Sequence, residues 1–129
     1  MSLIAIIGGS GLTNLNNLEI TRREVVRTPY GEPSAAMVFG RCGGHEVVFL
    51  PRHGAGHTIP PHEVNYRANL WALKQSGAAN VIAVNAVGAI TKLAVASLVF
   101  PDQIIDCTHG RQHTFFGSEH GQVTHIDFS

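Results

Sequence analysis

The stretch His45–Lys74, HEVVFLPRHGAGHTIPPHEVNYRANLWALK, joins a strand, a loop and a helix, and it decides the fold. Its first six residues, His45–Leu50, are mostly apolar and β-branched, which is typical of a strand. A glycine loop follows, and Pro60 and Pro61 keep this loop from becoming helical too early. From about Glu63 the spacing of apolar residues predicts a helix.

The helix from Glu63 is expected to be buried on two sides and to end near Gly77. Two apolar rows at helical spacing carry this prediction: Val64, Ala68 and Trp71, and then Tyr66, Leu70 and Leu73. The next apolar run, Asn80–Ala86, favours another strand. A strand, a helix and a strand in this order form a crossover unit of parallel β-structure.

Other apolar runs predict further strands on both sides of this unit. We expect them at Leu3–Ile7, Val25–Thr28 and Ala35–Arg41, with one further strand given by Leu98–Phe100 and Gln103–Asp106. Gly43–Gly44 is expected to form a hairpin turn, and the polar sequence after Asp106 predicts no regular structure. The fold class is therefore α/β, with a mixed, largely parallel central sheet flanked by helices.

Composition limits the classes of protein that this chain fits. A length of 129 residues suits one domain, and 44% hydrophobic with 14% charged residues argues against disorder. Nine Lys plus Arg balance nine Asp plus Glu, so a basic face for nucleic acid is not expected. No apolar stretch is long enough for a membrane span and no secretory signal is recognisable, so we expect a cytoplasmic protein with no membrane partner. Cys42 and Cys107 match no metal spacing and are interpreted as reduced.

Three strand ends carry residues that suit an anion. The run Gly8–Gly11 follows the first strand and brings Ser10, but it matches neither the dinucleotide fingerprint nor a P-loop. Arg52 and His53 follow the strand His45–Leu50, and Asn85 with Ala86 ends the strand Asn80–Ala86. Because the carboxyl ends of parallel strands face one side of a sheet, we expect these groups to meet there.

Eight histidines raise the alternative of a metal site. His53 with His57, and His109 with His113, have the i,i+4 spacing of metal ligands on a helix. Glycines interrupt both intervals, so neither pair fits a helix face, and no metal site is predicted.

Several motifs together resemble the methylthioadenosine and methylthioinosine phosphorylases of the purine nucleoside phosphorylase superfamily. They are IIGGSGL, TPYGEPS, RHGAGHTIPPHEVNYRANLWALK, VNAVGAI and DQIID with TFF, in the family's order and spacing. The resemblance implies an α/β phosphorylase, usually a homotrimer, that binds phosphate and a purine nucleoside at the carboxyl edge of its sheet. It also implies the reaction, in purine salvage: phosphate attacks C1′ of a 5′-methylthionucleoside and releases the purine and 5-methylthioribose 1-phosphate. No cofactor is implied beyond inorganic phosphate as co-substrate.

The resemblance also assigns residues to the phosphate site. They are Ser10, Arg52, His53, Asn85 and Ala86, with His57 beside them. Many relatives have Thr at the position of Ser10, and the adenosine-type relatives have Thr at that of Asn85. His125 corresponds to a His that reaches the neighbouring subunit.

Family members continue well beyond Ser129, and their later half holds the groups that bind ribose and base. We therefore expect residues 1–129 to be the N-terminal part of a single, truncated phosphorylase domain whose C-terminal part is absent. The residue that protonates the leaving purine is expected beyond position 129. Two alternatives stay open: a general purine nucleoside phosphorylase acting on inosine or guanosine, and a truncated remnant without activity.

Overall fold

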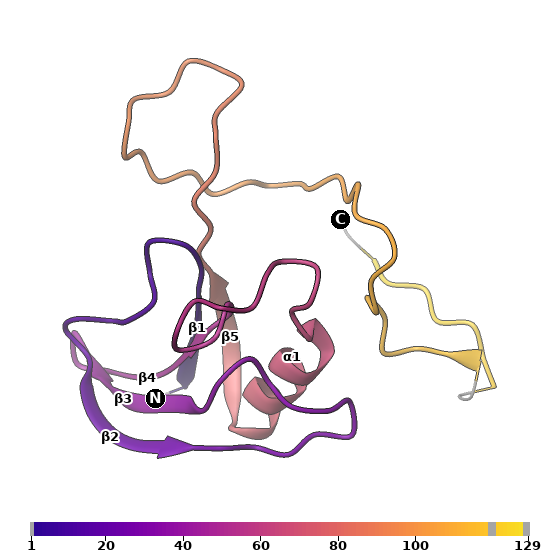
Figure 1. The fold of residues 1–129 in the computed structure, drawn as a ribbon, viewed down its shortest axis with the longest axis horizontal. Coiled ribbons are helices and arrows are strands. Elements are labelled where there is room, and N and C mark those ends of the chain that lie inside the picture. Colours follow the sequence, from indigo (N-terminus) through magenta and orange to yellow (C-terminus); the bar gives the residue numbers. More distant parts are fainter. Residues whose placement is uncertain (1, 119–120, 128–129) are drawn as a thin grey trace.

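The structure, a computed structural model, describes residues 2–118 and 121–127. Five strands form one sheet in the order β2-β3-β4-β1-β5 (Figure 1). Their bounds are β1, Leu3–Gly8; β2, Glu19–Glu24; β3, Met37–Cys42; β4, His45–Pro51; and β5, Ala78–Ala83. β1 pairs in parallel with β4 and β5, whereas β3 pairs antiparallel with β2 and β4. The mixed α/β fold expected from the sequence is confirmed, with α1, Tyr66–Gln75, as the one α-helix in the described part of the chain.

The core lies between one face of the sheet and α1. Side chains two positions apart point to the same face of a strand, and here the pairs from β1, β3 and β4 all turn toward the helix. The buried cluster consists of Ala5, Ile7, Met37, Phe39, Val48, Leu50, Ala72 and Leu73. β1 is the middle strand of the parallel part, which explains why its sequence is apolar without alternation.

The β3–β4 hairpin turns at the predicted glycines. Gly43 and Gly44 have φ values of 55° and 81°, and Cys42 pairs with His45 across the turn. A two-residue turn with both φ values positive matches the twist of the flanking strands and favours glycine. The sequence prediction of this hairpin is therefore confirmed.

The helix begins at Tyr66, later than the expected start at Glu63. Asn65 caps it, because its Oδ1 accepts a hydrogen bond from the backbone N–H of Ala68 at 3.1 Å. The Nδ2 of Asn65 also donates to the Tyr30 carbonyl at 2.7 Å, which fixes the cap to a distant turn. Ser76 is the C-cap, and Gly77 follows it with φ 87°.

The prediction that α1 is buried on two sides was wrong. The buried helical residues are Ala68, Asn69, Ala72 and Leu73, which form a single face. Leu70, from the second predicted row, is 42% exposed. The sheet covers only one side of α1, so apolar residues at helical spacing overstate its burial.

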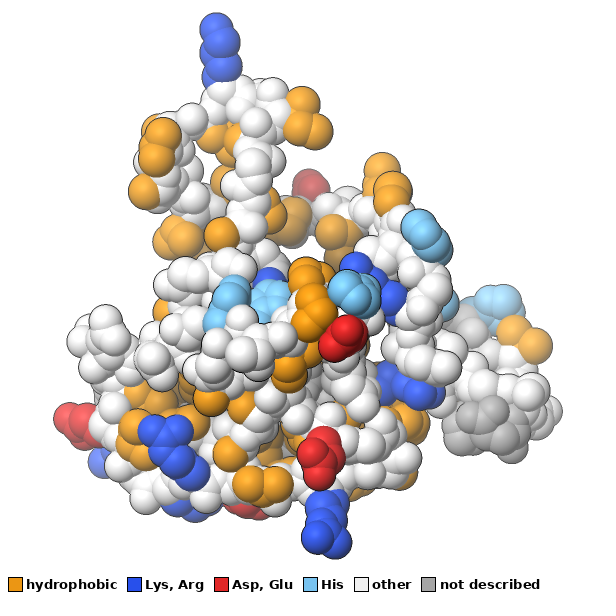
Figure 2. All heavy atoms as spheres, viewed as in Figure 1, with side chains coloured by type: hydrophobic (Ala, Val, Ile, Leu, Met, Phe, Trp, Pro, Cys, Tyr) orange, Lys and Arg blue, Asp and Glu red, His pale blue; other side chains and the backbone are white. Residues whose placement is uncertain are grey.

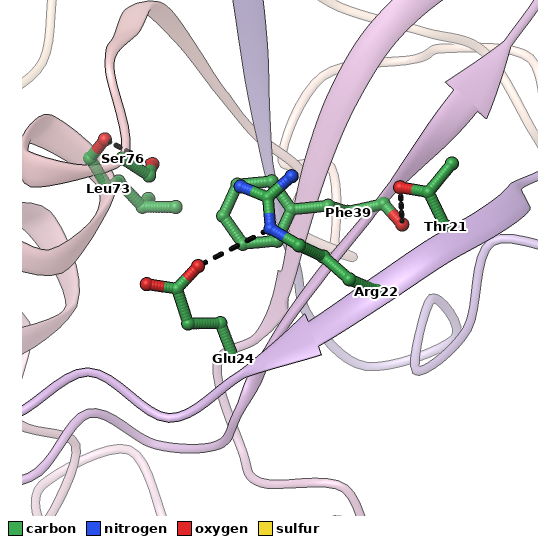
Figure 3. A network of polar contacts seen from close by, with 6 residues as sticks. All are labelled: Thr21, Arg22, Glu24, Phe39, Leu73 and Ser76. Atoms are coloured by element: carbon green, nitrogen blue, oxygen red, sulfur yellow. Dashed lines mark hydrogen bonds and ion pairs between the residues drawn. The ribbon is translucent and has the colours of Figure 1, made fainter.

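The predicted strand Val25–Thr28 was also wrong, because β2 lies earlier, at Glu19–Glu24. β2 is exposed along its whole length and four of its six residues are charged, a pattern tolerated by an edge strand. Figure 3 shows what holds it: the Arg22 guanidinium stacks 3.6 Å from the centre of the Phe39 ring, and Thr21 Oγ1 donates to the Phe39 carbonyl. These contacts join neighbouring strands and leave no periodic signal in the sequence.

Beyond β5 the described residues form no α-helix or strand. The last ladder hydrogen bond joins Val84 N–H to the Ile7 carbonyl at 2.9 Å, so the strand predicted to reach Ala86 ends earlier. The further strand predicted from Leu98–Phe100 and Gln103–Asp106 does not form, and the described residues after Ala83 contain no strand. A short apolar run becomes a strand only beside a partner, and the outer edge of β5 has none in the described part of the chain. Among the described residues, no helix is long and apolar enough to cross a membrane.

Candidate phosphate site at three strand ends

The turns after β1, β4 and β5 start side by side because β1 lies between the other two strands. The N–H of Arg52 donates to the Gly8 carbonyl at 2.9 Å, which extends the β1–β4 ladder past the end of β4. On the other side, Val84 N–H bonds to the Ile7 carbonyl at 2.9 Å. The carboxyl ends of the three strands therefore lie at one edge of the sheet, as expected from parallel pairing.

A pocket of about 410 Å³ opens where these turns meet. Ser10 lines it from the turn after β1, Arg52, His53 and His57 from the loop after β4, and Ala86 from the segment after β5. Asn85 joins the group through a hydrogen bond that its Oδ1 accepts from Nη1 of Arg52. The structure thus brings together the residues that the sequence assigned to one site.

His125 lies outside this group. It is exposed and does not line the pocket. Its expected role in a neighbouring subunit stays a prediction.

Two glycines make room for the site. A Cβ on Gly8 would press directly against the Leu12 carbonyl and lie 2.6 Å from Cζ of Phe49. A Cβ on Gly9 would lie 2.6 Å from Nη2 of Arg52 and 2.7 Å from the Val84 carbonyl oxygen. The run of glycines that the sequence offers as a turn is therefore also a steric requirement for bringing Arg52 against the end of β1.

His53 is buried and both of its ring nitrogens are engaged. Its surface is 6% exposed, its Nε2 lies 3.2 Å from Nε of Arg52, and its Nδ1 lies 2.8 Å from the Ile59 carbonyl oxygen. The ring of His57 meets it edge-on, with 4.8 Å between centroids. The Ile59 carbonyl is a partner that sequence reasoning missed, because a backbone group in a loop carries no residue-type signal.

The loop after β4 is closed by its own backbone. Gly54 N–H donates to the Pro51 carbonyl at 3.0 Å, and His57 N–H donates to the Gly54 carbonyl at 3.1 Å. Gly54 has φ 79°, and His57, at φ 53°, adopts a conformation that non-glycine residues seldom use. These turns aim the side chains of His53 and His57 into the pocket together.

The described side chains around this pocket do not form a group of metal ligands. Within residues 2–118 and 121–127, no group of three or more His, Cys, Asp or Glu side chains could hold a metal ion. Of the two i,i+4 pairs, His53–His57 has one ring already bonded through both nitrogens, and His109–His113 is exposed. The neighbouring guanidinium and hydroxyl suit an anion instead.

The family model described as the phosphorylase superfamily matches residues 3–129 of this sequence. The chain belongs to this superfamily. The resemblance expected from the motifs at the strand ends is thereby confirmed.

Individual relatives agree with the family match. A protein of Pseudomonas syringae pv. tomato named probable S-methyl-5'-thioinosine phosphorylase is 52% identical over 130 residues, which cover 100% of this chain and 53% of that protein. The S-methyl-5'-thioadenosine phosphorylase of Hyperthermus butylicus is 51% identical, over 98% of this chain and 46% of its own. Among solved structures, the methylthioadenosine phosphorylase of Schistosoma mansoni in its apo form gives a TM-score of 0.80 at 39% identity, covering 98% of this chain and 45% of that one. The chain spans about half the length of these relatives.

Proposed function

We propose that this chain is part of an enzyme that phosphorolyses a 5′-methylthio-purine nucleoside, methylthioinosine or methylthioadenosine, in purine salvage. Residues 1–129 are then the N-terminal part of a single phosphorylase domain. The observation that carries the proposal is the position of Arg52, which lines the pocket where the turns after β1, β4 and β5 meet. The names of the relatives from P. syringae and H. butylicus support the class of reaction.

In this proposal the pocket holds inorganic phosphate. Arg52 suits that ligand because its planar fork binds two oxygens and stays charged at any working pH. Ser10 and Ala86 line the same pocket from the neighbouring turns and add a hydroxyl and a backbone amide. The volume of about 410 Å³ leaves space beside the phosphate for part of a second substrate.

The chemistry follows from placing that anion beside the sugar. An oxygen of phosphate forms a bond to C1′ while the bond from C1′ to the purine nitrogen breaks, and the electron pair of that bond leaves with the purine. The sugar passes through an oxocarbenium-like state, which a negative charge close to C1′ stabilises. The purine nitrogen then takes a proton, and we assign its donor to the part of the relatives that this chain does not span.

One alternative has direct support among the relatives. The 6-oxopurine nucleoside phosphorylase of Pyrococcus furiosus is 45% identical over 100% of this chain and 50% of its own. A general purine nucleoside phosphorylase acting on inosine or guanosine is therefore the second candidate. A truncated remnant without activity, the other alternative that the sequence leaves open, is the third candidate.

The proposal includes the setting of the enzyme. It needs no cofactor besides phosphate, it acts as a homotrimer in the cytoplasm, and it has no nucleic-acid partner. Equal numbers of basic and acidic residues support the last point. His125 is assigned to the ribose pocket of the neighbouring subunit.

Base release separates the candidates. The purified chain is incubated with phosphate and, in turn, methylthioinosine, methylthioadenosine, inosine and guanosine, and free base is followed by chromatography, with the P. syringae relative as positive control. Release from a methylthionucleoside supports the proposal, and release from inosine or guanosine alone supports the alternative. If the chain releases no base, the result favours the inactive remnant. Phosphate binding then still tests the anion site.

Arg52→Ala tests the phosphate site itself. We expect the affinity for inorganic phosphate, measured by titration calorimetry, to fall roughly 10- to 100-fold, the effect of one or two charge-assisted hydrogen bonds. Arg23→Ala is the matched control, because Arg23 is exposed on β2, away from the pocket. Equal affinity in the wild-type chain and Arg52→Ala would show that the anion site is placed wrongly.

A further inference from the structure

The guanidinium of Arg52 is held on three sides. Its Nε donates to Nε2 of His53 at 3.2 Å, and its Nη1 donates to Oδ1 of Asn85. Its Nη2 lies against Gly9, where an added Cβ would be only 2.6 Å away. Because the group is planar, three such restraints fix both its position and the direction of its plane.

The partners of His53 determine which ring nitrogen carries hydrogen. Arg52 Nε can only donate, so Nε2 of His53 accepts. The Ile59 carbonyl can only accept, so Nδ1 of His53 donates across 2.8 Å. This is the neutral Nδ1–H tautomer, and it leaves the buried ring without an N–H for an anion.

On the side away from Arg52, the loop after β4 holds the imidazole of His53 through Ile59. Ile59 N–H donates to the backbone carbonyl of His53 at 3.0 Å, while Nδ1 of His53 donates back to the Ile59 carbonyl. The two residues therefore close the loop with a reciprocal pair of hydrogen bonds. The ring of His57, at 61° to that of His53, packs against it. As a result, Nε2 stays aimed at Arg52.

We propose that the imidazole of His53 is a positioning group that acts through Arg52 and does not itself bind the phosphate. The inference rests on the proposed function, since it takes inorganic phosphate as the anion at Arg52. Because Nε and one N–H of Nη1 are engaged, three N–H groups of Arg52, one on Nη1 and two on Nη2, are left for the anion. His53 thus selects the end that receives the anion, and Asn85 steadies it from the neighbouring strand end.

The tautomer of His53 is the first test, and it needs no phosphate. Long-range ¹H–¹⁵N correlation spectra of the purified chain near pH 7.5 distinguish the two neutral forms of each imidazole from the charged one. His53→Gln supplies the assignment, because its spectrum lacks the His53 signals. We expect the neutral Nδ1–H form, whereas an Nε2–H or doubly protonated ring would overturn the inference whether or not the proposed function holds.

Two substitutions separate the two hydrogen bonds of the ring. The side chain of Gln reaches the position of Nε2 and can accept from Arg52, whereas that of Asn reaches only the position of Nδ1. We expect His53→Asn to weaken phosphate binding roughly three- to tenfold, the effect of one hydrogen bond, and His53→Gln to recover most of the loss. Circular dichroism checks that both variants fold. A loss of equal size in both variants would contradict the inference.

A double-mutant cycle with Arg52→Lys decides between action through Arg52 and direct contact. Lysine keeps a cation but has no Nε to receive orientation from position 53. We expect His53→Asn to change phosphate affinity less than about twofold in the Arg52→Lys background, because coupled residues do not add. The same loss in both backgrounds would mean that His53 contacts the anion directly. If the wild-type chain binds no phosphate, the proposed function fails at this site while the tautomer still tests His53.

Discussion

Residues 2–83 and residues 84–127 are similarly rich in apolar side chains but differ in what those side chains touch. In the first region, hydrogen bonds from side chains join distant positions, such as Asn65 to Tyr30 and Asn69 to Ser34. In the second, most of them close turns of two or three residues, as from Ser97 to Ala94. Figure 2 shows the outcome: hydrophobic side chains stand on the surface of the loop that projects from the sheet.

The presence of a facing layer, and not composition, decides which apolar side chains are buried here. Leu50 and Leu73 are fully buried because the sheet and α1 face each other. Ile90, Val95 and Ile105 are 107%, 99% and 91% exposed, because no described element lies over them. So large an exposed apolar surface is rare in folded monomeric proteins.

The largest effect expected from this comparison comes from truncating one leucine in each region. Leu73→Ala should lower the free energy of unfolding by about 2–5 kcal/mol, because it leaves a cavity between α1 and the sheet. Leu98 is 84% exposed, so Leu98→Ala should change it by less than about 0.5 kcal/mol. Urea unfolding followed by the fluorescence of Trp71 measures both. Similar losses in the two variants would show that the second region packs in solution.

The same contrast explains which parts of the fold could be predicted from the sequence. β1, the β3–β4 hairpin and α1 have apolar periodicity and glycine signals that agree with their packing, so the sequence located them to within a few residues. β2 has no such signal, because it is held by Arg22 stacking on Phe39. The strand predicted after residue 97 has the apolar signal but no neighbouring strand, so the pattern alone was misleading.

For the candidate site, residue types were predictable and their connections were not. Ser10, Arg52 and Ala86 follow apolar strands, and parallel pairing alone was enough to bring them together. The bond from His53 to the Ile59 carbonyl depends on the path of the loop and on a backbone atom. The sequence therefore identifies the histidine, but it does not predict the tautomer that the neighbouring groups impose.

The second-largest expected effect concerns the contact between residues 2–83 and residues 84–127. The Phe115 ring meets Tyr30 edge-on at 5.1 Å, next to a hydrogen bond from Arg67 to the Thr114 carbonyl at 3.4 Å. We expect Phe115→Ala to weaken this contact by about 1 kcal/mol, so that trypsin cleaves after Arg111 severalfold faster.

The matched control for this contact is the adjacent ring. Phe116 is 49% exposed, and Phe116→Ala should leave the rate of cleavage after Arg111 close to that of the wild-type chain. Faster cleavage in Phe116→Ala alone would mean that the neighbouring ring, and not Phe115, attaches the second region to the first.

The smallest expected effect concerns one turn in residues 84–127, and it shows whether local contacts alone form that turn. The Thr108 hydroxyl and backbone N–H both donate to Oδ1 of Asp106, at 2.7 and 2.8 Å, and hold the pKa of that carboxyl below its usual value. The turn is therefore stabilised above the ordinary pKa of aspartate and loses this contribution as the pH falls through the lowered value. Thr108→Val should raise the pKa of Asp106 toward the usual value, as measured by NMR titration, whereas Thr91→Val should leave it unchanged.

A peptide spanning residues 104–110 tests whether the turn forms without the rest of the chain. If the turn depends only on neighbours two positions apart, the pKa of Asp106 in the peptide should be lowered in the same direction as in the chain, because the Thr108 donors travel with it. The charges of His113 and Arg111, which contribute less, are absent from the peptide, so the shift should be slightly smaller. An ordinary pKa in the peptide would mean that contacts with residues 2–83 shape the second region after all, and the contrast between the two regions would then be one of degree.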